Sequence, residues 1–274
     1  FFSVLHRCKM FLRLSDDELQ YISDYVQTAT MSRVCLRFWG LLHGRHVSCN
    51  VTGHTIPETM AKIKGTDVYS AVIRCTEMND DSVQALAELK ETDVRSLTLS
   101  LPTSKVGDMG AQALAALRAA PRLTTLTLDL CGHELEYSST QALAALRHAS
   151  TLESLTINLN SKLPRYCGAH ILAAFSEAPS LEALRLSLDG NQIGDSGALA
   201  LASLKDASNL KQLDLGLQSN QLGDSGARAL ATLGDAPSLT ALNLDLRFNQ
   251  IGNSGATALS ALRETRLNNF ALRI

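Results

Sequence analysis

One short stretch of the chain brings together side chains that could bind a metal ion. The run His43-x-x-His46-x-x-Cys49-x-x-x-x-His54 offers three imidazoles and one thiol. Zinc accepts these atom types, but structural zinc sites use paired ligands at short spacings that this order does not reproduce. We therefore interpret the run as a histidine-rich connecting loop, and we expect no metal and no cofactor.

A second candidate for chemistry is the sequence Gly-Asp-Ser-Gly, which could form a turn that presents a nucleophilic serine. It occurs at residues 194–197 and again at residues 223–226. Because it returns at the same position of successive units, we interpret it as the start of a helix. The sequence contains no phosphate-binding loop and no Ser-His-Asp or Cys-His arrangement. This predicts a protein that is not an enzyme.

Two tyrosines stand out as candidates for binding a partner. Tyr137 and Tyr166 hold equivalent positions in neighbouring units, where later units have aspartate, and Arg165 precedes the second tyrosine. Tyrosine and arginine are frequent at the energetic centres of protein interfaces, so these residues could form an anchor patch. Alternatively, each ring covers a gap in an irregular unit.

The elements that position these residues recur with a period of about 29 residues, which marks a solenoid whose units cannot bury their apolar faces alone. The clearest unit reads Leu181-x-x-Leu184-x-Leu186-x-Leu188, and the same pattern begins again at Leu210 and at Leu239. Earlier units step back to Val94 and then to Val68, and a last one begins at Leu267. This gives about eight units.

Each unit predicts a strand followed by a helix. Leucines at alternate positions place one face of a strand in the core, whereas Leu201 and Leu204 have helical spacing. Asp195, Asp224 and Asn253 precede the helical stretches, and we expect each to cap the N-terminus of its own helix.

The residues between the strand leucines should face the other side of the sheet. Most are small and polar, which makes this surface a weak candidate for tight binding, and the charged candidates among them are Arg185, Asp214 and Asp245. The full column is Thr98, Ser100, Thr127, Asp129, Thr156, Asn158, Arg185, Ser187, Asp214, Gly216, Asn243 and Asp245.

The pattern resembles the leucine-rich repeat family, and its length and helical half are similar to the ribonuclease-inhibitor subtype. The resemblance covers residues 68–274 and implies an α/β solenoid with a curved parallel sheet inside and helices outside. The family's asparagine stands about ninth in the unit, whereas Asn191, Asn220 and Asn249 stand eleventh. This predicts longer strands or a bulge at each strand entry. A buried asparagine ladder is expected only through these three units.

Residues 1–46 predict a separate helical segment. Ser15 and Glu18 form a capping box, and Leu14 and Leu19 are placed as a hydrophobic staple. A second amphipathic stretch follows at residues 31–42. We expect residues 47–67 to form a connector or a degenerate first repeat, and residues 68–274 to form the repeats, the last truncated after its strand.

Residues 14–42 resemble an F-box. The features that carry the resemblance are Leu14, Leu19, Ile22, Tyr25, Val26, Val34 and Trp39. The resemblance implies that these side chains bind the small Skp-type adaptor of a cullin ubiquitin ligase. The chain departs from the family at Ser15, where proline is usual, and between Val26 and Val34, where it is shorter. The alternative is a helical cap that covers the open edge of the first repeat.

Composition narrows the class of partner. The net charge of -2 gives no electrostatic reason for nucleic-acid binding. No apolar run approaches the ~20 residues of a membrane span. The cysteines show no paired spacing, so we expect reduced thiols and an intracellular protein, cytoplasmic by default.

Two functions remain open. The chain could be the substrate-recognition subunit of a cullin-type ligase, or a structural or assembly subunit of a larger complex. The strand pattern Leu267-x-x-Phe270-x-Leu272-x-Ile274 has no helix after it. Because open sheet edges recruit other strands, we expect a further protein at this C-terminal edge.

Overall fold

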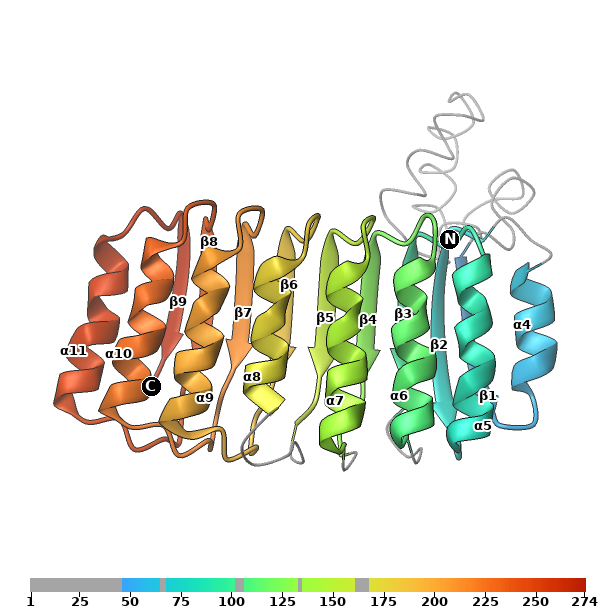
Figure 1. The fold of residues 1–274 in the computed structure, drawn as a ribbon, viewed down its shortest axis with the longest axis horizontal. Coiled ribbons are helices and arrows are strands. Elements are labelled where there is room, and N and C mark those ends of the chain that lie inside the picture. Colours follow the sequence, from blue (N-terminus) through green and yellow to red (C-terminus); the bar gives the residue numbers. More distant parts are fainter. Residues whose placement is uncertain (1–45, 65–67, 102–105, 133–134, 161–167) are drawn as a thin grey trace, which may run out of the picture.

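The computed structural model describes residues 46–64, 68–101, 106–132, 135–160 and 168–274 (Figure 1). The F-box-like residues lie outside this part of the chain, as do Arg165 and Tyr166. These residues are Leu14, Leu19, Ile22, Tyr25, Val26, Val34 and Trp39.

The described strands form one parallel sheet in sequence order. They are β1 (His46–Thr52), β2 (Ser70–Thr76), β3 (Ser96–Ser100), β4 (Thr125–Asp129), β5 (Ser154–Asn158), β6 (Ala183–Ser187), β7 (Gln212–Gly216), β8 (Ala241–Asp245) and β9 (Asn269–Arg273).

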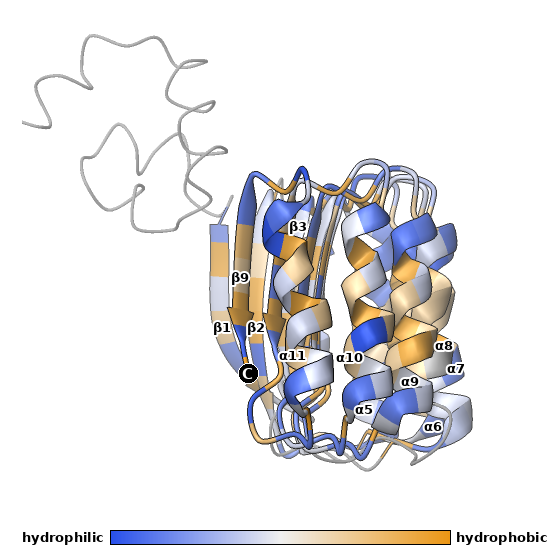
Figure 2. Ribbon diagram, turned by 90° about the vertical axis from the view of Figure 1, so that its left-hand side faces the viewer, coloured by the Kyte–Doolittle hydropathy of each residue, from blue (hydrophilic) through white to orange (hydrophobic). Residues whose placement is uncertain are grey.

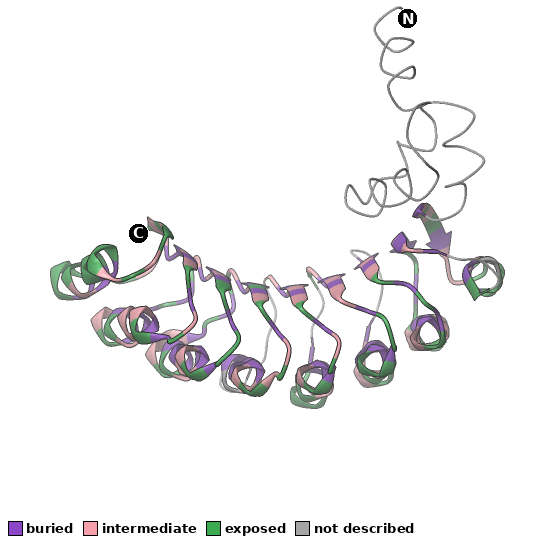
Figure 3. Ribbon diagram, turned by 90° about the horizontal axis from the view of Figure 1, so that it is seen from above, coloured by how far each residue is buried: buried purple, intermediate pink, exposed green. Residues whose placement is uncertain are grey.

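A second layer of helices covers one face of this sheet. They are α4 (Ile56–Lys64), α5 (Asp80–Leu86), α6 (Asp108–Ala115), α7 (Tyr137–Ala144), α8 (Gly168–Leu172), α9 (Gly194–Leu201), α10 (Asp224–Ala231) and α11 (Asn253–Ser260), and α5 to α11 each continue into a short 3-10 segment. Figure 2 shows the two layers edge-on. Figure 3 shows an arc with the strands on its inner side, which confirms an α/β solenoid with the sheet inside and the helices outside.

The core register follows the leucine period. Leu184, Leu213 and Leu242 lie opposite one another on β6, β7 and β8. Leu215 is 0% exposed, whereas the side chain of its neighbour Asp214 is 25% exposed. The predicted inward and outward faces are therefore confirmed, since a slip of one residue would have exchanged them.

The expectation of longer strands or bulges is wrong. Strands β3 to β8 have five residues each, and their residues pair one to one across the sheet. The residues that displace Asn191, Asn220 and Asn249 along the unit lie after the strand, in the turn that leads to each asparagine.

The asparagine ladder is present in the three units where it was expected. The Oδ1 atom of Asn220 accepts hydrogen bonds from the backbone N–H groups of Asn191 (2.9 Å) and Ile193 (3.2 Å). Its Nδ2 atom donates to Leu188 O at 2.9 Å. Asn220 is fully buried, so these bonds satisfy backbone groups that water cannot reach. Asn249 repeats the arrangement one unit later.

The prediction that Asp195, Asp224 and Asn253 cap their own helices is wrong, and Asn253 lies inside α11 with Gly252 before it as the N-cap. Asp195 lies inside α9, and its Oδ1 atom accepts hydrogen bonds from Gly223 N (2.7 Å) and Gly226 N (2.9 Å) at the start of α10. Asp224 does the same for α11. Because each aspartate lies in the first turn of its own helix, its side chain projects away from that helix toward the next one. The first backbone N–H groups of the next helix have no partners within that helix. Each aspartate thus caps the helix of the following unit.

The histidine-rich run is not a connecting loop throughout. His46 and Cys49 lie in β1, which pairs with β2 from His46–Ser70 to Thr52–Thr76. The His46 Nδ1 atom is 2.9 Å from Ser70 Oγ. Within the described ranges, no group of three or more histidine, cysteine or acidic residues could hold a metal ion. Because β1 pairs with β2 and α4 follows β1, residues 46–64 add a strand and a helix at the start of the sheet.

Candidate interaction surfaces

The inner face of the sheet presents rows of side chains that run from strand to strand. Thr98, Thr127 and Thr156 lie opposite one another on β3, β4 and β5. The same row continues into Arg185 on β6, Asp214 on β7 and Asn243 on β8. Hydroxyl groups therefore occupy the middle of the face, and charged and amide groups follow toward its C-terminal end.

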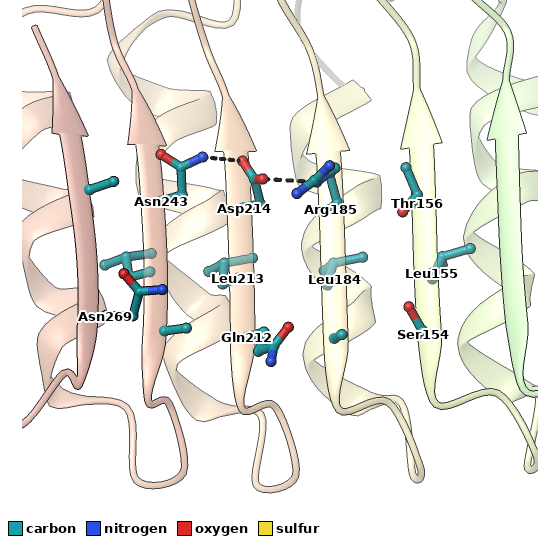
Figure 4. Close-up of a pocket in the computed structure, with 14 residues that line it drawn as sticks. Ser154, Leu155, Thr156, Leu184, Arg185, Gln212, Leu213, Asp214, Asn243 and Asn269 are labelled. Carbon is teal, nitrogen blue, oxygen red and sulfur yellow. Dashed lines mark hydrogen bonds and ion pairs between the residues drawn. The ribbon is translucent and has the colours of Figure 1, made fainter. Parts of the chain in front are cut away.

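The charged part of this row is linked side chain to side chain (Figure 4). The Nε atom of Arg185 lies 2.8 Å from Asp214 Oδ2, and Asn243 Nδ2 donates to Asp214 Oδ1 at 3.0 Å. The Arg185 side chain is 61% exposed. An exposed pair of this kind contributes about 0–1 kcal/mol to folding. Its groups are therefore available to a partner at little cost to stability.

A shallow hollow of about 390 Å³ lies in front of this row. Its lining comes from β5 to β9 and includes Ser154, Thr156, Gln212 and Asn269 in addition to the linked row. The lining mixes these hydrogen-bonding side chains with apolar residues such as Ala183, Ala241 and Ala271, so it offers both kinds of contact to a partner.

Asp245, the third charged candidate, is buried beneath its partners. Its carboxylate accepts hydrogen bonds from Arg247 Nε (2.9 Å) and Nη2 (2.7 Å), and from Gln218 Nε2 (3.2 Å). Arg273 Nη1 approaches it at 3.4 Å. The hydrogen bonds from Arg247 hold the pKa of Asp245 below its usual range, although burial opposes this shift. Asp245 thus fixes two guanidinium groups at the surface.

Tyr137 is the described member of the tyrosine pair. It is the first residue of α7 and is 52% exposed. Because Tyr166 and Arg165 lie outside the described residues, the predicted anchor patch stays a prediction.

Phe248 was missed by the sequence reasoning. It follows Arg247 in the turn after β8, is 78% exposed, and has a backbone φ of 59°. Aligning the units by their leucines places it in one column with Gly190 and Ser219. The exchange of glycine for an aromatic residue in that column was the signal that could have identified it.

Cysteine chemistry is not favoured in the described core. Burial raises the pKa of Cys75 to about 12, with a smaller contribution from Cys49. A thiol with so high a pKa stays protonated near neutral pH and is a poor nucleophile. Cys75 acts as a small apolar residue between β2 and the helices.

Comparison with known proteins agrees with the repeat pattern. A family model described as Leucine Rich repeat matches residues 180–202, 207–231 and 237–260. This region therefore contains leucine-rich repeats. No curated protein sequence matches the chain.

Two solved structures show distant similarity. An internalin from Listeria monocytogenes is 19% identical over 77% of this chain, with a TM-score of 0.35, and the match spans 62% of the internalin. The yeast complex of Rad7 and Elc1 matches 94% of this chain and 82% of that chain at 12% identity, with a TM-score of 0.36.

Among the described residues, no helix is long and apolar enough to cross a membrane.

Proposed function

We propose that this chain is a protein-interaction scaffold that serves as the substrate-recognition subunit of a cullin-type ubiquitin ligase. The inner face of the repeats holds the target, and the N-terminal segment holds a Skp-type adaptor. The observation that carries the proposal is the row Arg185–Asp214–Asn243, whose polar groups are linked across the inner face of the sheet, with Arg185 exposed.

The alternation of buried and more exposed residues along each strand supports a recognition surface. The leucines of β6 and β7 are buried, so they fix the backbone, while the residues between them lie on the opposite face and are more exposed. Side chains on a rigid sheet can change without unfolding the repeats, and they lose little backbone entropy when a partner binds. In the described strands, the inner face has no aromatic side chain, which predicts a polar interface.

The adaptor half of the proposal rests on the F-box resemblance of residues 14–42. In that resemblance, Leu19 and Ile22 belong to the apolar surface that the adaptor covers. The test mixes the full chain with a purified Skp-type adaptor and follows co-elution by size-exclusion chromatography. We expect a complex with the natural chain and none with the double variant Leu19→Asp, Ile22→Asp.

The chain offers a matched control for that experiment. Leu199 is 66% exposed on α9, so Leu199→Asp adds a similar charge without touching the N-terminal segment. This variant should bind the adaptor normally, and all three proteins should share the same circular dichroism spectrum. If the natural chain does not bind the adaptor at micromolar concentrations, the segment is a cap on the first repeat and the ligase role is lost.

A second function is that of a structural or assembly subunit, in which β9 would be a contact with the rest of the assembly. Within residues 168–274, β9 pairs with β8 and has no strand on its outer side. Phe270 and Leu272 remain partly exposed there, beside Arg263 and Arg273. A strand edge with apolar side chains is a site for pairing with a further strand, either from a later part of the same protein or from another chain. Purification of the native assembly at its natural concentration would decide between the two functions.

A further inference from the structure

The backbone at Phe248 has a conformation that favours glycine. The equivalent residues of other described units are Glu77 (φ 56°), Gly132 (φ 83°), Gly190 (φ 72°) and Ser219 (φ 53°), and Phe248 has φ 59°. A bulky side chain is a true outlier in this left-handed region, and holding it there costs conformational free energy. Glycine at this position would be at least as compatible with the backbone conformation of the fold.

Burial does not compensate for that cost. The Phe248 residue is 78% exposed, so it is more exposed than Tyr137, Leu199 or Ile274. At the equivalent Gly132, an added Cβ atom would meet nothing within 4 Å. The turn therefore projects into open space, and the ring has no gap in the core to fill. A strained and exposed aromatic residue is explained more simply by recognition than by folding.

The charged neighbours of Phe248 are held in place and face outward. Arg247 binds Asp245 through two of its nitrogens, and Arg273 approaches the same carboxylate from β9. The Arg247 and Arg273 side chains are 43% and 63% exposed, whereas the Asp245 side chain is 11% exposed. A molecule that approaches this surface meets the two guanidinium groups first, because Asp245 lies underneath, and Asp189 is a second carboxylate close enough to act on Arg247.

Each guanidinium retains hydrogen-bonding capacity. Arginine carries five N–H donors, and the bonds to Asp245 use only some of them. The remaining donors can bind a carboxylate on another molecule, and such charge-assisted bonds are stronger than neutral ones. Because Asp245 already orders the Arg247 side chain, less rotamer entropy is lost on binding.

We propose that Phe248, Arg247 and Arg273, positioned by Asp245, form a docking site for an acidic segment of a protein partner. We refer to these four residues as the Phe248 patch. The ring enters an apolar pocket or packs on an apolar side chain of the partner, and aspartate or glutamate residues beside that pocket bind the two guanidinium groups. Aromatic and arginine side chains are the residue types that dominate interface energetics.

The chemistry of the patch favours a protein over other polyanions. Nucleic acids and anionic membranes are bound through many cations acting together. The Phe248 patch holds two cations that are partly balanced by Asp245, in a chain of net charge -2. The inference rests on the proposed function only in assuming that the repeats bind a protein, and it does not depend on the adaptor.

The test selects binders to the full chain from a displayed library of random peptides. Affinities of the selected peptides are then measured by fluorescence anisotropy for the natural chain and for Phe248→Gly, Arg185→Ala and Leu199→Ala. We expect enriched peptides to combine an apolar residue with aspartate or glutamate. Phe248→Gly should weaken their binding about ten-fold or more, and Leu199→Ala should leave it unchanged. Binding should also weaken as salt is added.

Thermal unfolding separates a lost contact from a lost fold. Phe248→Gly should have a melting temperature equal to or above that of the natural chain, because glycine removes the left-handed strain. A lower melting temperature would show that the ring supports the fold and would overturn the proposal. So would a library without binders, a set of binders without acidic residues, or equal binding to Phe248→Gly.

Two further outcomes distinguish this inference from the proposed function. Peptides that lose affinity for Arg185→Ala, but not for Phe248→Gly, would place recognition on the inner face and eliminate the Phe248 patch alone. Binding to phosphatidylserine vesicles that disappears in Phe248→Gly, with no peptide binding, would make the patch a membrane contact and overturn the proposal.

Discussion

The carboxylate of Asp195 on α9 accepts a hydrogen bond from the backbone N–H of Gly226 on α10, at 2.9 Å. A Cβ atom on Gly226 would lie 2.6 Å from the accepting oxygen. Gly226 is therefore both the donor and the residue whose small size lets the carboxylate approach. The recurrence of Asp and Gly in the units follows from this contact between neighbouring helices.

We predict that Asp195→Ala destabilises the protein by about 1–2 kcal/mol, the usual cost of losing a helix cap. The loss leaves Gly223 N and Gly226 N without their acceptor. Chemical denaturation monitored by circular dichroism measures the effect. Asn253→Ala is the control, because Asn253 holds the same position in α11 and residues 265–274 contain no helix for it to cap. Equal losses in the two variants would contradict the cap between units.

Asn220→Ala should cost about 2–5 kcal/mol, since it leaves buried N–H groups of Asn191 and Ile193 unpaired. Guanidinium unfolding curves provide the measurement. Gln212→Ala, at an exposed amide side chain of the same unit, should change stability by no more than about 0.5 kcal/mol. A small effect at Asn220 would show that water replaces the ladder.

Leu215→Ala should destabilise by about 2–5 kcal/mol because it creates a cavity in a fully buried site. Asp214→Ala, one residue away on the inner face, should cost about 1 kcal/mol or less, because it removes a partly exposed ion pair with Arg185 and one hydrogen bond from Asn243. Urea midpoints of the two variants compare the two faces directly. A reversed order would mean that the strand register is shifted by one residue.

The stability of the C-terminal units should depend on pH through Asp245. Its pKa is lowered in the folded protein from the ordinary value of 3.8, chiefly by the hydrogen bonds from Arg247. A carboxyl with a depressed folded pKa contributes stability above its unfolded pKa and loses it as pH falls through the folded pKa. From a pH of about 5 to about 2, the natural chain should therefore lose more stability than Asp245→Asn. Parallel losses in urea titrations would contradict this assignment.

Hydrogen exchange tests whether the C-terminal edge is covered. In the isolated chain, we expect the amides of residues 267–274 to exchange faster than those of β7, because β9 has a neighbour on one side only. In the native assembly, a bound partner or further chain should slow them. Fast exchange in both states would remove this argument for a larger complex.

The repetition of residue types explains what could be predicted from the sequence. Three identical leucine sets identified the faces of β6, β7 and β8, and three asparagines identified the ladder. The same residue type at the same position of three units indicates the same environment in each unit. The strand β1 was foreseen only within a possible degenerate first repeat, because its sequence, His-Val-Ser-Cys-Asn-Val-Thr, has no leucine. The cap between units was missed because the spacing along the chain does not show whether the Asp195 carboxylate accepts hydrogen bonds from its own helix or from the next one.

The two kinds of polar contact between units run in opposite directions along the chain. Asp195 reaches forward to the following unit, whereas Asn220 reaches back to the preceding one. Between the units of β6, β7 and β8, both kinds are present. If either neighbour unfolds, a backbone group of the other therefore loses its hydrogen-bond partner. Between α5 and α6, the described contact is the forward one from Asp80 to Gly107 and Gly110.

We therefore expect cooperativity to be uneven along the array, because the positions equivalent to Asn191 hold Lys162 and His133 in the two preceding units. In a repeat protein, stability is carried by the interfaces between neighbours, and unfolding divides the array where coupling is weakest. Residues 181–260 should melt as one block at the highest temperature, and the units that precede them should separate first. The recognition surfaces proposed above, the row at Arg185 and the patch at Phe248, both lie on the block that unfolds last.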